Sequence, residues 1–221
     1  MNAPFPVQFP LTLLGLVGWA MPSMCLVAHA GHPLAAPGVT SLTNSDIDYR
    51  VAEAHHVILE RGGATAIIAD NSAVDVPELP GHRAGYSGLA SLRHSRRKAN
   101  LFVPSYAGLN FEHIHDGTTA GLIEAFEPRK FPMELRLIDA HTVELHQPPT
   151  GNWKLESCGR YHILDDGTIE YTFECIPRAD GFRNGYIGLF WASYIDRPEK
   201  RSIFFKEDGK LPVPLRDPQE T

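Results

Sequence analysis

Prolines and glycines divide this chain into segments that are too short for long helices. The 221 residues include 18 prolines and 19 glycines, and proline breaks a helix interior while glycine weakens it. No window as long as an ordinary helix places its apolar residues at helical spacing, and residues 118–126 would form about two turns at most. The sequence therefore predicts an all-β fold of short strands joined by turns.

Several segments alternate apolar and polar residues, as strands with one wet face do. Residues 133–137 and 142–146 both show this period of two. Gly62-Gly63 lies between two apolar runs, which predicts a hairpin. Residues 186–195 are apolar on both faces, which is typical of a covered central strand. Regularly spaced strands with turn signals between them favour an antiparallel β-sandwich.

The first thirty residues have the features of a signal peptide. They contain no Lys, Arg, Asp or Glu, and an apolar run over residues 11–27 leads into Ala28-His29-Ala30. This ending fits the small residues that signal peptidase requires. We expect residues 1–30 to be removed on export to the periplasm or the cell exterior, leaving no stable membrane span; an uncleaved leader is the alternative.

The sequence of the remaining residues predicts a linker followed by one domain. Residues 31–48 are rich in Pro, Gly, Ser and Ala and show no period, so they predict a flexible linker. Residues 49–221 have the length of a single β-sandwich domain. The tail over residues 210–221 contains three prolines and no evident closing strand, so we expect the sandwich to be incomplete at its C-terminus.

The formal net charge of −6 gives the protein little attraction to a phosphate backbone, so we expect no nucleic-acid partner. The one basic cluster, residues 93–98, contains no aromatic side chain on which a base could stack. We interpret it as a solvated loop.

Two cysteines, Cys158 and Cys175, lie on either side of an Asp166-Gly167 turn signal. With a two-residue turn at this point the two cysteines would face each other across a hairpin. In an oxidising compartment that arrangement makes them a disulfide candidate. Two reduced core cysteines are the alternative.

The densest group of reactive side chains is Phe111-Glu112-His113-Ile114-His115-Asp116. Alternation along a strand predicts His113 and His115 on one face, and Glu112 and Asp116 on the other. The two imidazoles are candidate catalytic acid and base, or a pair of metal ligands, although their spacing supplies no third ligand. Structural histidines are the alternative. We expect no bound metal and no cofactor.

The order of these features resembles the galactose-mutarotase-like supersandwich proteins, which include the aldose 1-epimerases. The similar parts are Gly85-Tyr86-Ser87-Gly88-Leu89, the run Tyr106 to Gly117, and the strand, Pro, Trp, strand, Asp-Asp-Gly order of residues 143–175. The resemblance implies a large antiparallel sandwich and a carbohydrate ligand. The family's second, catalytic histidine would fall within residues 188–195, which contain none.

We therefore expect an exported carbohydrate-binding or carbohydrate-active protein with a small-molecule or oligosaccharide ligand. If it is an enzyme, the expected class is an isomerase, lyase or hydrolase that moves a proton on a sugar. One alternative is a non-catalytic secreted module, and another is a metal-dependent hydrolase that uses His113 and His115. Charged, amide and aromatic groups suit sugar hydroxyls and C–H faces, and the candidate substrate-binding residues are Asn110, Glu112, Trp191 and Tyr194.

Overall fold

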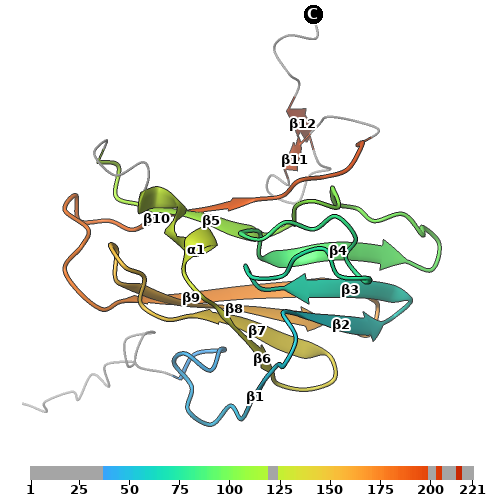
Figure 1. Ribbon diagram of the computed structural model, residues 1–221, viewed down its shortest axis with the longest axis horizontal. Helices are drawn as coiled ribbons and strands as arrows, with labels where there is room; N and C mark the ends of the chain where they lie inside the picture. The colour runs from blue at the N-terminus through green and yellow to red at the C-terminus, as the bar shows by residue number, and fades with distance from the viewer. Residues whose placement is uncertain (1–36, 119–123, 199–202, 206–212, 216–221) are drawn as a thin grey trace, which may run out of the picture. The chain divides into compact units, whose positions relative to one another are not determined.

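The computed structural model describes residues 37–118, 124–198, 203–205 and 213–215. The signal peptide expected over residues 1–30 lies outside these ranges. Within them, helical structure is confined to a 3-10 turn at Glu124–Phe126 and the single-turn helix α1 at Glu127–Lys130. The described strands pair antiparallel (Figure 1), so the expected all-β fold is confirmed.

One layer is a five-stranded sheet in the order β1-β6-β7-β8-β9. Because each neighbouring pair is antiparallel, its later strands form a simple meander. The strands are β1 Arg50–Val51, β6 Glu134–Leu137, β7 Thr142–Gln147, β8 Leu155–Ile163 and β9 Ile169–Pro177.

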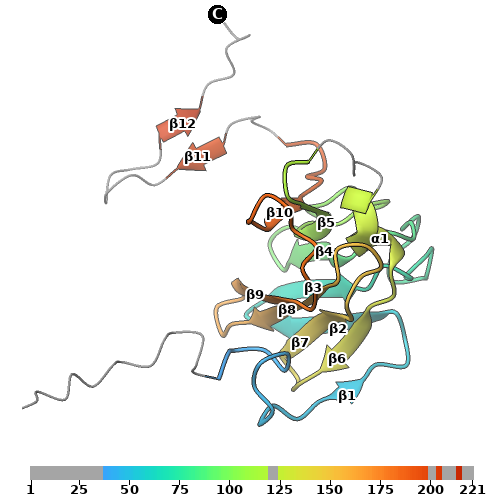
Figure 2. The same cartoon turned by 90° about the vertical axis from the view of Figure 1, so that its left-hand side faces the viewer.

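The facing layer has two parts. A three-stranded sheet has the order β2-β3-β4, and a separate pair joins β5 to β10. Two hydrogen bonds between Leu89 and Gly108, of 2.8 and 2.9 Å, connect β4 to the segment before β5. Figure 2 shows β4, β5 and β10 above the five-stranded sheet. The strands are β2 His56–Arg61, β3 Ala64–Ala69, β4 Gly88–His94, β5 Asn110–His115 and β10 Gly188–Ala192.

A further hairpin pairs β11 (Ile203–Phe205) with β12 (Val213–Leu215). Among the described residues, no helix has the length and apolar character needed to cross a membrane.

The main core lies between the two layers. Apolar side chains of β2, β3 and β4 meet those of β6, β7 and β8 in one cluster. Each fully buried Leu, Ile or Val contributes about 1.5–3 kcal/mol relative to an exposed one, so this interface is a principal source of stability. The largest members are Leu59, Ile68, Leu89, Phe102, Leu135, Val143, Leu145, Tyr161 and Ile163.

The two layers also touch at the tips of two hairpins. Gly62 and Gly63 form the predicted turn between β2 and β3, with φ of 57° and 79°, which confirms that hairpin. A Cβ at Gly62 would overlap the backbone of the β8–β9 turn. Arg61 forms an ion pair with Asp165 in that turn and donates to the Ile163 carbonyl at 3.3 Å.

The predicted pairing of the two cysteines is wrong. The turn between β8 and β9 has three residues, Asp165 to Gly167, closed by a hydrogen bond from the Leu164 N–H to the Thr168 carbonyl at 2.8 Å. The register therefore shifts by one, so that Cys158 lies opposite Glu174 and Cys175 lies opposite Ser157. A shift of one residue puts two side chains on opposite faces of a sheet, and both thiols are free.

Residues 39–43 lie on the outer, polar face of the five-stranded sheet, within the segment for which the sequence predicts a linker. The Glu174 carboxylate on β9 accepts hydrogen bonds from the Val39 N–H at 2.7 Å and from the Thr40 and Thr43 hydroxyls at 2.6 Å each. The buried Glu144 carboxylate on β7 accepts from the Ser41 N–H and hydroxyl. We call residues 39–43 the arm.

Candidate ligand-binding site

The β5 motif contains a β-bulge. His113 lies opposite Phe190 and Phe111 lies opposite Trp191, so Glu112 is an extra residue with no counterpart on β10. The bulge interrupts the alternation that the sequence suggests. Because of it, Phe111 and Ile114 both pack into a second apolar cluster beneath the β5–β10 pair.

The bulge leaves His113 between aromatic rings. Its imidazole meets Phe126 edge-on at 4.1 Å between centroids and stacks on Phe190 at 5.1 Å. Burial lowers the pKa of His113, and its Nε2 is buried with no hydrogen-bond partner among the described residues. These surroundings suit a neutral packing residue better than one that exchanges protons with a ligand.

His115 lies at the end of β5, directly over Gly188 of β10, where any Cβ would overlap the imidazole. Its Nδ1 accepts a hydrogen bond from the Gly117 N–H at 3.3 Å, which leaves Nε2 to carry the proton of the neutral ring. Among the described residues, no three His, Cys, Asp or Glu side chains gather where they could hold a metal ion.

Asp116 joins the end of β5 to the β9–β10 loop. Its buried carboxylate accepts from the Arg183 N–H at 2.7 Å, and its carbonyl accepts from the Asn184 side chain at 2.8 Å. Hydrogen bonds from the Thr118 hydroxyl and N–H hold the pKa of Asp116 below its usual value. Asp116 therefore positions the loop as an ionised hydrogen-bond acceptor.

The β9–β10 loop, residues 177–187, surrounds an open hollow of about 630 Å³. This volume lies within the range of small-molecule sites. Its lining combines cationic, anionic and aromatic groups, including Arg178, Asp180, Arg183 and Tyr186. The Tyr186 side chain is 49% exposed, so a ligand in the hollow could cover its ring. We call this feature the loop hollow.

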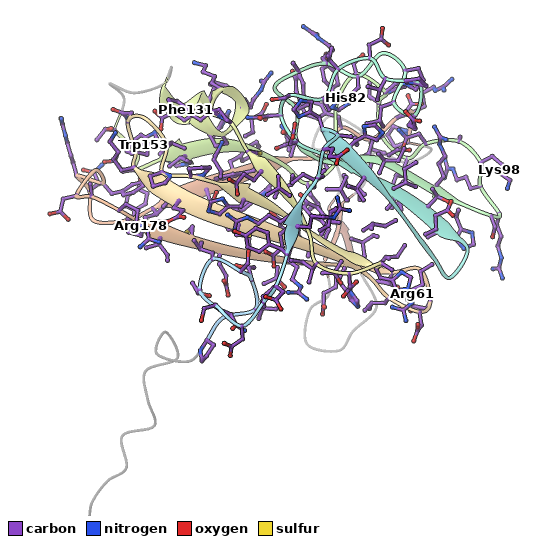
Figure 3. All side chains as sticks on the ribbon, turned by 60° about the horizontal axis from the view of Figure 1, so that its bottom comes forward. Arg61, His82, Lys98, Phe131, Trp153 and Arg178 are labelled. Atoms are coloured by element: carbon purple, nitrogen blue, oxygen red, sulfur yellow. The ribbon has the colours of Figure 1, made fainter. Side chains whose placement is uncertain are left out.

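One wall of the loop hollow is fixed by contacts to neighbouring strands. Phe182 stacks on the buried Trp153, with ring centroids 5.1 Å apart, and Arg178 donates to Glu156 on β8 at 2.6 Å. Figure 3 shows Arg178 and Trp153 at the same end of the sandwich. The side chain of Arg183, by contrast, makes no hydrogen bond or ion pair with the rest of the described chain. The loop hollow thus has a rigid wall and a cation available to a ligand.

The predicted substrate-binding residues do not line the loop hollow. Glu112 and Tyr194 do meet, because the Tyr194 hydroxyl donates to the Glu112 carboxylate at 3.0 Å. Arg129 of α1 forms an ion pair with the same carboxylate at 3.2 Å and lies over the Tyr86 ring at 4.1 Å. Burial and the neighbouring Glu112 raise the pKa of Tyr194 to about 12. This group holds α1 against β5.

Asn110 is buried, and Trp191 is half-buried against the second apolar cluster. Trp191 stacks on Phe111 and donates from its indole to the Tyr171 hydroxyl at 3.0 Å. The fully buried Asn110 accepts from the Ser87 N–H at 3.1 Å through its side-chain carbonyl. Neither residue lines the loop hollow.

Sequence reasoning missed the loop-hollow residues Arg178, Asp180 and Arg183. They follow no motif spacing, and only Tyr186 belongs to an apolar run with strand character. The signal that could have found them is local composition, since two arginines, an aspartate and two glycines lie together between two strands.

Comparison with known proteins gives no match to this chain among family models, curated proteins or solved structures.

Proposed function

We propose that this is an exported carbohydrate-binding protein that receives its ligand in the loop hollow. The observation that carries the proposal is a small-molecule-sized hollow lined both by a half-exposed tyrosine and by an arginine with no partner within the described chain. A sugar ring presents C–H faces that pack on an aromatic ring, and its hydroxyls bond to charged side chains in the same site.

The fixed wall supports this proposal. Glu156 orders the loop at Arg178, and Trp153 and Asp116 order it at the adjacent residues Phe182 and Arg183. A loop ordered before the ligand arrives loses less conformational entropy on binding, which improves affinity. The expected export rests on the first thirty residues, and the sandwich-like fold is compatible with the mutarotase-like resemblance.

The surroundings of the candidate acid and base side chains favour binding over catalysis. His113 is enclosed by aromatic rings, and the His115 imidazole lies over Gly188 and accepts a hydrogen bond from the Gly117 N–H. A general acid or base must reach the proton that it transfers, and neither group lines the loop hollow. We therefore assign the protein a binding role.

The experiment is a calorimetric titration of the protein with neutral and acidic mono- and oligosaccharides. We expect a sugar to bind, and Tyr186→Ala to weaken its affinity by about two- to tenfold, because stacking on an aromatic ring contributes about 0.5–1.5 kcal/mol. The matched control is Tyr49→Ala, since Tyr49 is 44% exposed and lies outside the loop hollow. No binding by any sugar, or equal affinity in Tyr186→Ala, contradicts the proposal.

Arg183 gives a second, polar test of the same site. Arg183→Ala should weaken sugar binding by about tenfold, as expected for the loss of a charge-assisted hydrogen bond. Arg197→Ala is the control, because Arg197 is exposed, is paired with Asp196 and does not line the loop hollow. If both variants reduce affinity equally, the effect is one of overall charge and the loop hollow is not the site.

A further inference from the structure

The strand β2 has a free edge with a groove beside it. Among the described strands its one neighbour is β3, and an open groove of about 530 Å³ runs along Val57, Ile58 and Leu59. The groove is walled by residues 48–50 and 137–140. An edge strand with an accessible groove is a template on which another strand can pair.

Hairpin geometry shows which backbone groups face this groove. Arg61 and Ala64 flank the two-residue Gly62-Gly63 turn, so they form a hydrogen-bonded pair. Alternation then directs the amides and carbonyls of residues 57, 59 and 61 toward β3. Those of His56, Ile58 and Glu60 point away from β3, and no hydrogen bond within the described residues uses them.

The side chains on the same three residues are also suited to pairing. Ile58 is 46% exposed at the centre of the edge, although its neighbour Leu59 is only 2% exposed. His56 and Glu60 lie two residues to either side of it. His56 has one distant acidic neighbour, Glu78 at 3.5 Å, and Glu60 accepts from Thr65 at 3.2 Å. Both retain further hydrogen-bonding capacity.

We infer that β2 pairs with β2 of a second copy of this chain, antiparallel and about a two-fold axis at Ile58. This register places His56 opposite Glu60 of the partner subunit, and the reverse pair follows by symmetry. The outward backbone groups of both strands would then exchange about six hydrogen bonds. The two three-stranded sheets become one continuous sheet across the dimer.

We choose a second copy of this chain as the partner of β2 because the exposed edge of β2 is complementary to itself. A two-fold interface uses the same patch on both subunits, so a residue and its opposite must be compatible. The centre of this edge is apolar, and its two ends carry an imidazole and a carboxylate. Exposed Tyr49 (44%) and Val51 (48%) extend the apolar surface beside the groove, which gives the partner more area to bury.

The first test is the mass of the protein in solution, measured by sedimentation equilibrium on the full chain as it is recovered from expression. We expect a dimer that Ile58→Lys weakens at least about tenfold, because two like charges would meet at the axis. Ile195→Lys is the matched control, since Ile195 is 49% exposed and lies outside the groove. A monomer at all concentrations, or a dimer unaffected by Ile58→Lys, overturns the inference.

The second test checks the register. Opposed residues in a hydrogen-bonded pair have Cα atoms about 5.5 Å apart, which a disulfide can span. Ile58→Cys should therefore form a covalent dimer on mild oxidation, whereas Ile195→Cys should not. His56→Glu should weaken the dimer, and the double variant His56→Glu with Glu60→Lys should restore it. The proposed register is overturned if the protein is a dimer but Ile58→Cys does not cross-link. It is also overturned if the double variant does not restore the dimer.

Discussion

At the scale of single residues, the β5–β10 pair depends on the absence of a side chain at Gly188. The His115 imidazole occupies the space that a Cβ at this position would need. His115 was selected from the sequence as a catalytic candidate, yet its ring is also a packing element over β10. Gly188 and His115 lie 73 residues apart in the sequence. The sequence therefore gave no sign of this contact, because it depends on the pairing of two segments that are distant in the chain.

Gly188→Ala should lower the free energy of unfolding by about 1–3 kcal/mol, since the added methyl group must displace the imidazole. Urea denaturation measures this change. Removing the ring by His115→Ala should make the added methyl group nearly neutral, so the two substitutions should couple in a double-mutant cycle. Additive effects in the cycle would show that the two residues do not meet.

The thiols give a second prediction at the residue scale. Burial and the nearby Glu144 carboxylate raise the pKa of Cys158 to about 12, and burial raises the pKa of Cys175. The thiolate is the reactive form, so neither thiol should react with a thiol reagent at pH 8 in the folded protein. Both should react after denaturation without reductant, and a failure to do so would indicate a disulfide.

At the scale of elements, the arm and the five-stranded sheet form one hydrogen-bonded unit. Glu174 and Glu144 supply the acceptors, and the arm supplies backbone N–H groups and hydroxyls. Arg160 adds a hydrogen bond to the Val39 carbonyl at 2.8 Å. The Pro, Gly, Ser and Ala content of residues 31–48 predicted only a flexible linker. Composition cannot show that carboxylates far along the chain accept from those same polar groups.

Acid should release the arm. Burial raises the pKa of Glu174, but hydrogen bonds from Thr40, Thr43 and Val39 outweigh it and hold that pKa below its usual value of 4.5. A carboxyl whose folded pKa is depressed contributes stability above its unfolded pKa and loses it as pH falls through the folded pKa. Hydrogen exchange of the Val39 and Thr40 amides should therefore accelerate as pH falls below about 4.5, after correction for intrinsic rates.

Glu174→Gln should loosen the arm at neutral pH and lower the free energy of unfolding by about 1–2 kcal/mol, because charge-assisted hydrogen bonds are replaced by weaker ones. Glu170→Gln is the control, since Glu170 is exposed on the same face of β9. Equal protection of the arm amides in the two variants would contradict a specific role for Glu174.

At the scale of the whole molecule, periodicity predicted the class of fold and several strands correctly. The alternating runs became β6 and β7, and Gly62-Gly63 became the β2–β3 turn. Register was harder, because Asp166-Gly167 fits both a two-residue turn and a three-residue turn that ends in a glycine with positive φ. The structure uses the latter, with Gly167 at φ 84°, and every side chain of β9 changes face relative to the prediction.

The candidate site was less predictable than the fold for a related reason. Residues in a strand alternate between its two faces, so the face of each side chain can be predicted from the sequence. Even in β5, however, the single extra residue Glu112 changes which side chains share a face. The loop hollow is formed by a segment without a period, and its walls depend on contacts with Trp153 and Glu156 from elsewhere in the chain. Only the folded arrangement brings these groups together.

The contact between the two hairpin tips has a mechanical consequence. Gly62 and Arg61 join the layers at the turn where β9 begins, and the loop hollow begins where β9 ends, nine residues later. That length of strand is about 30 Å. The tips therefore tie the two layers together at the end of β9 that lies far from the loop hollow. Arg61→Ala would remove the ion pair and the hydrogen bond of this tie while leaving every residue that lines the hollow in place.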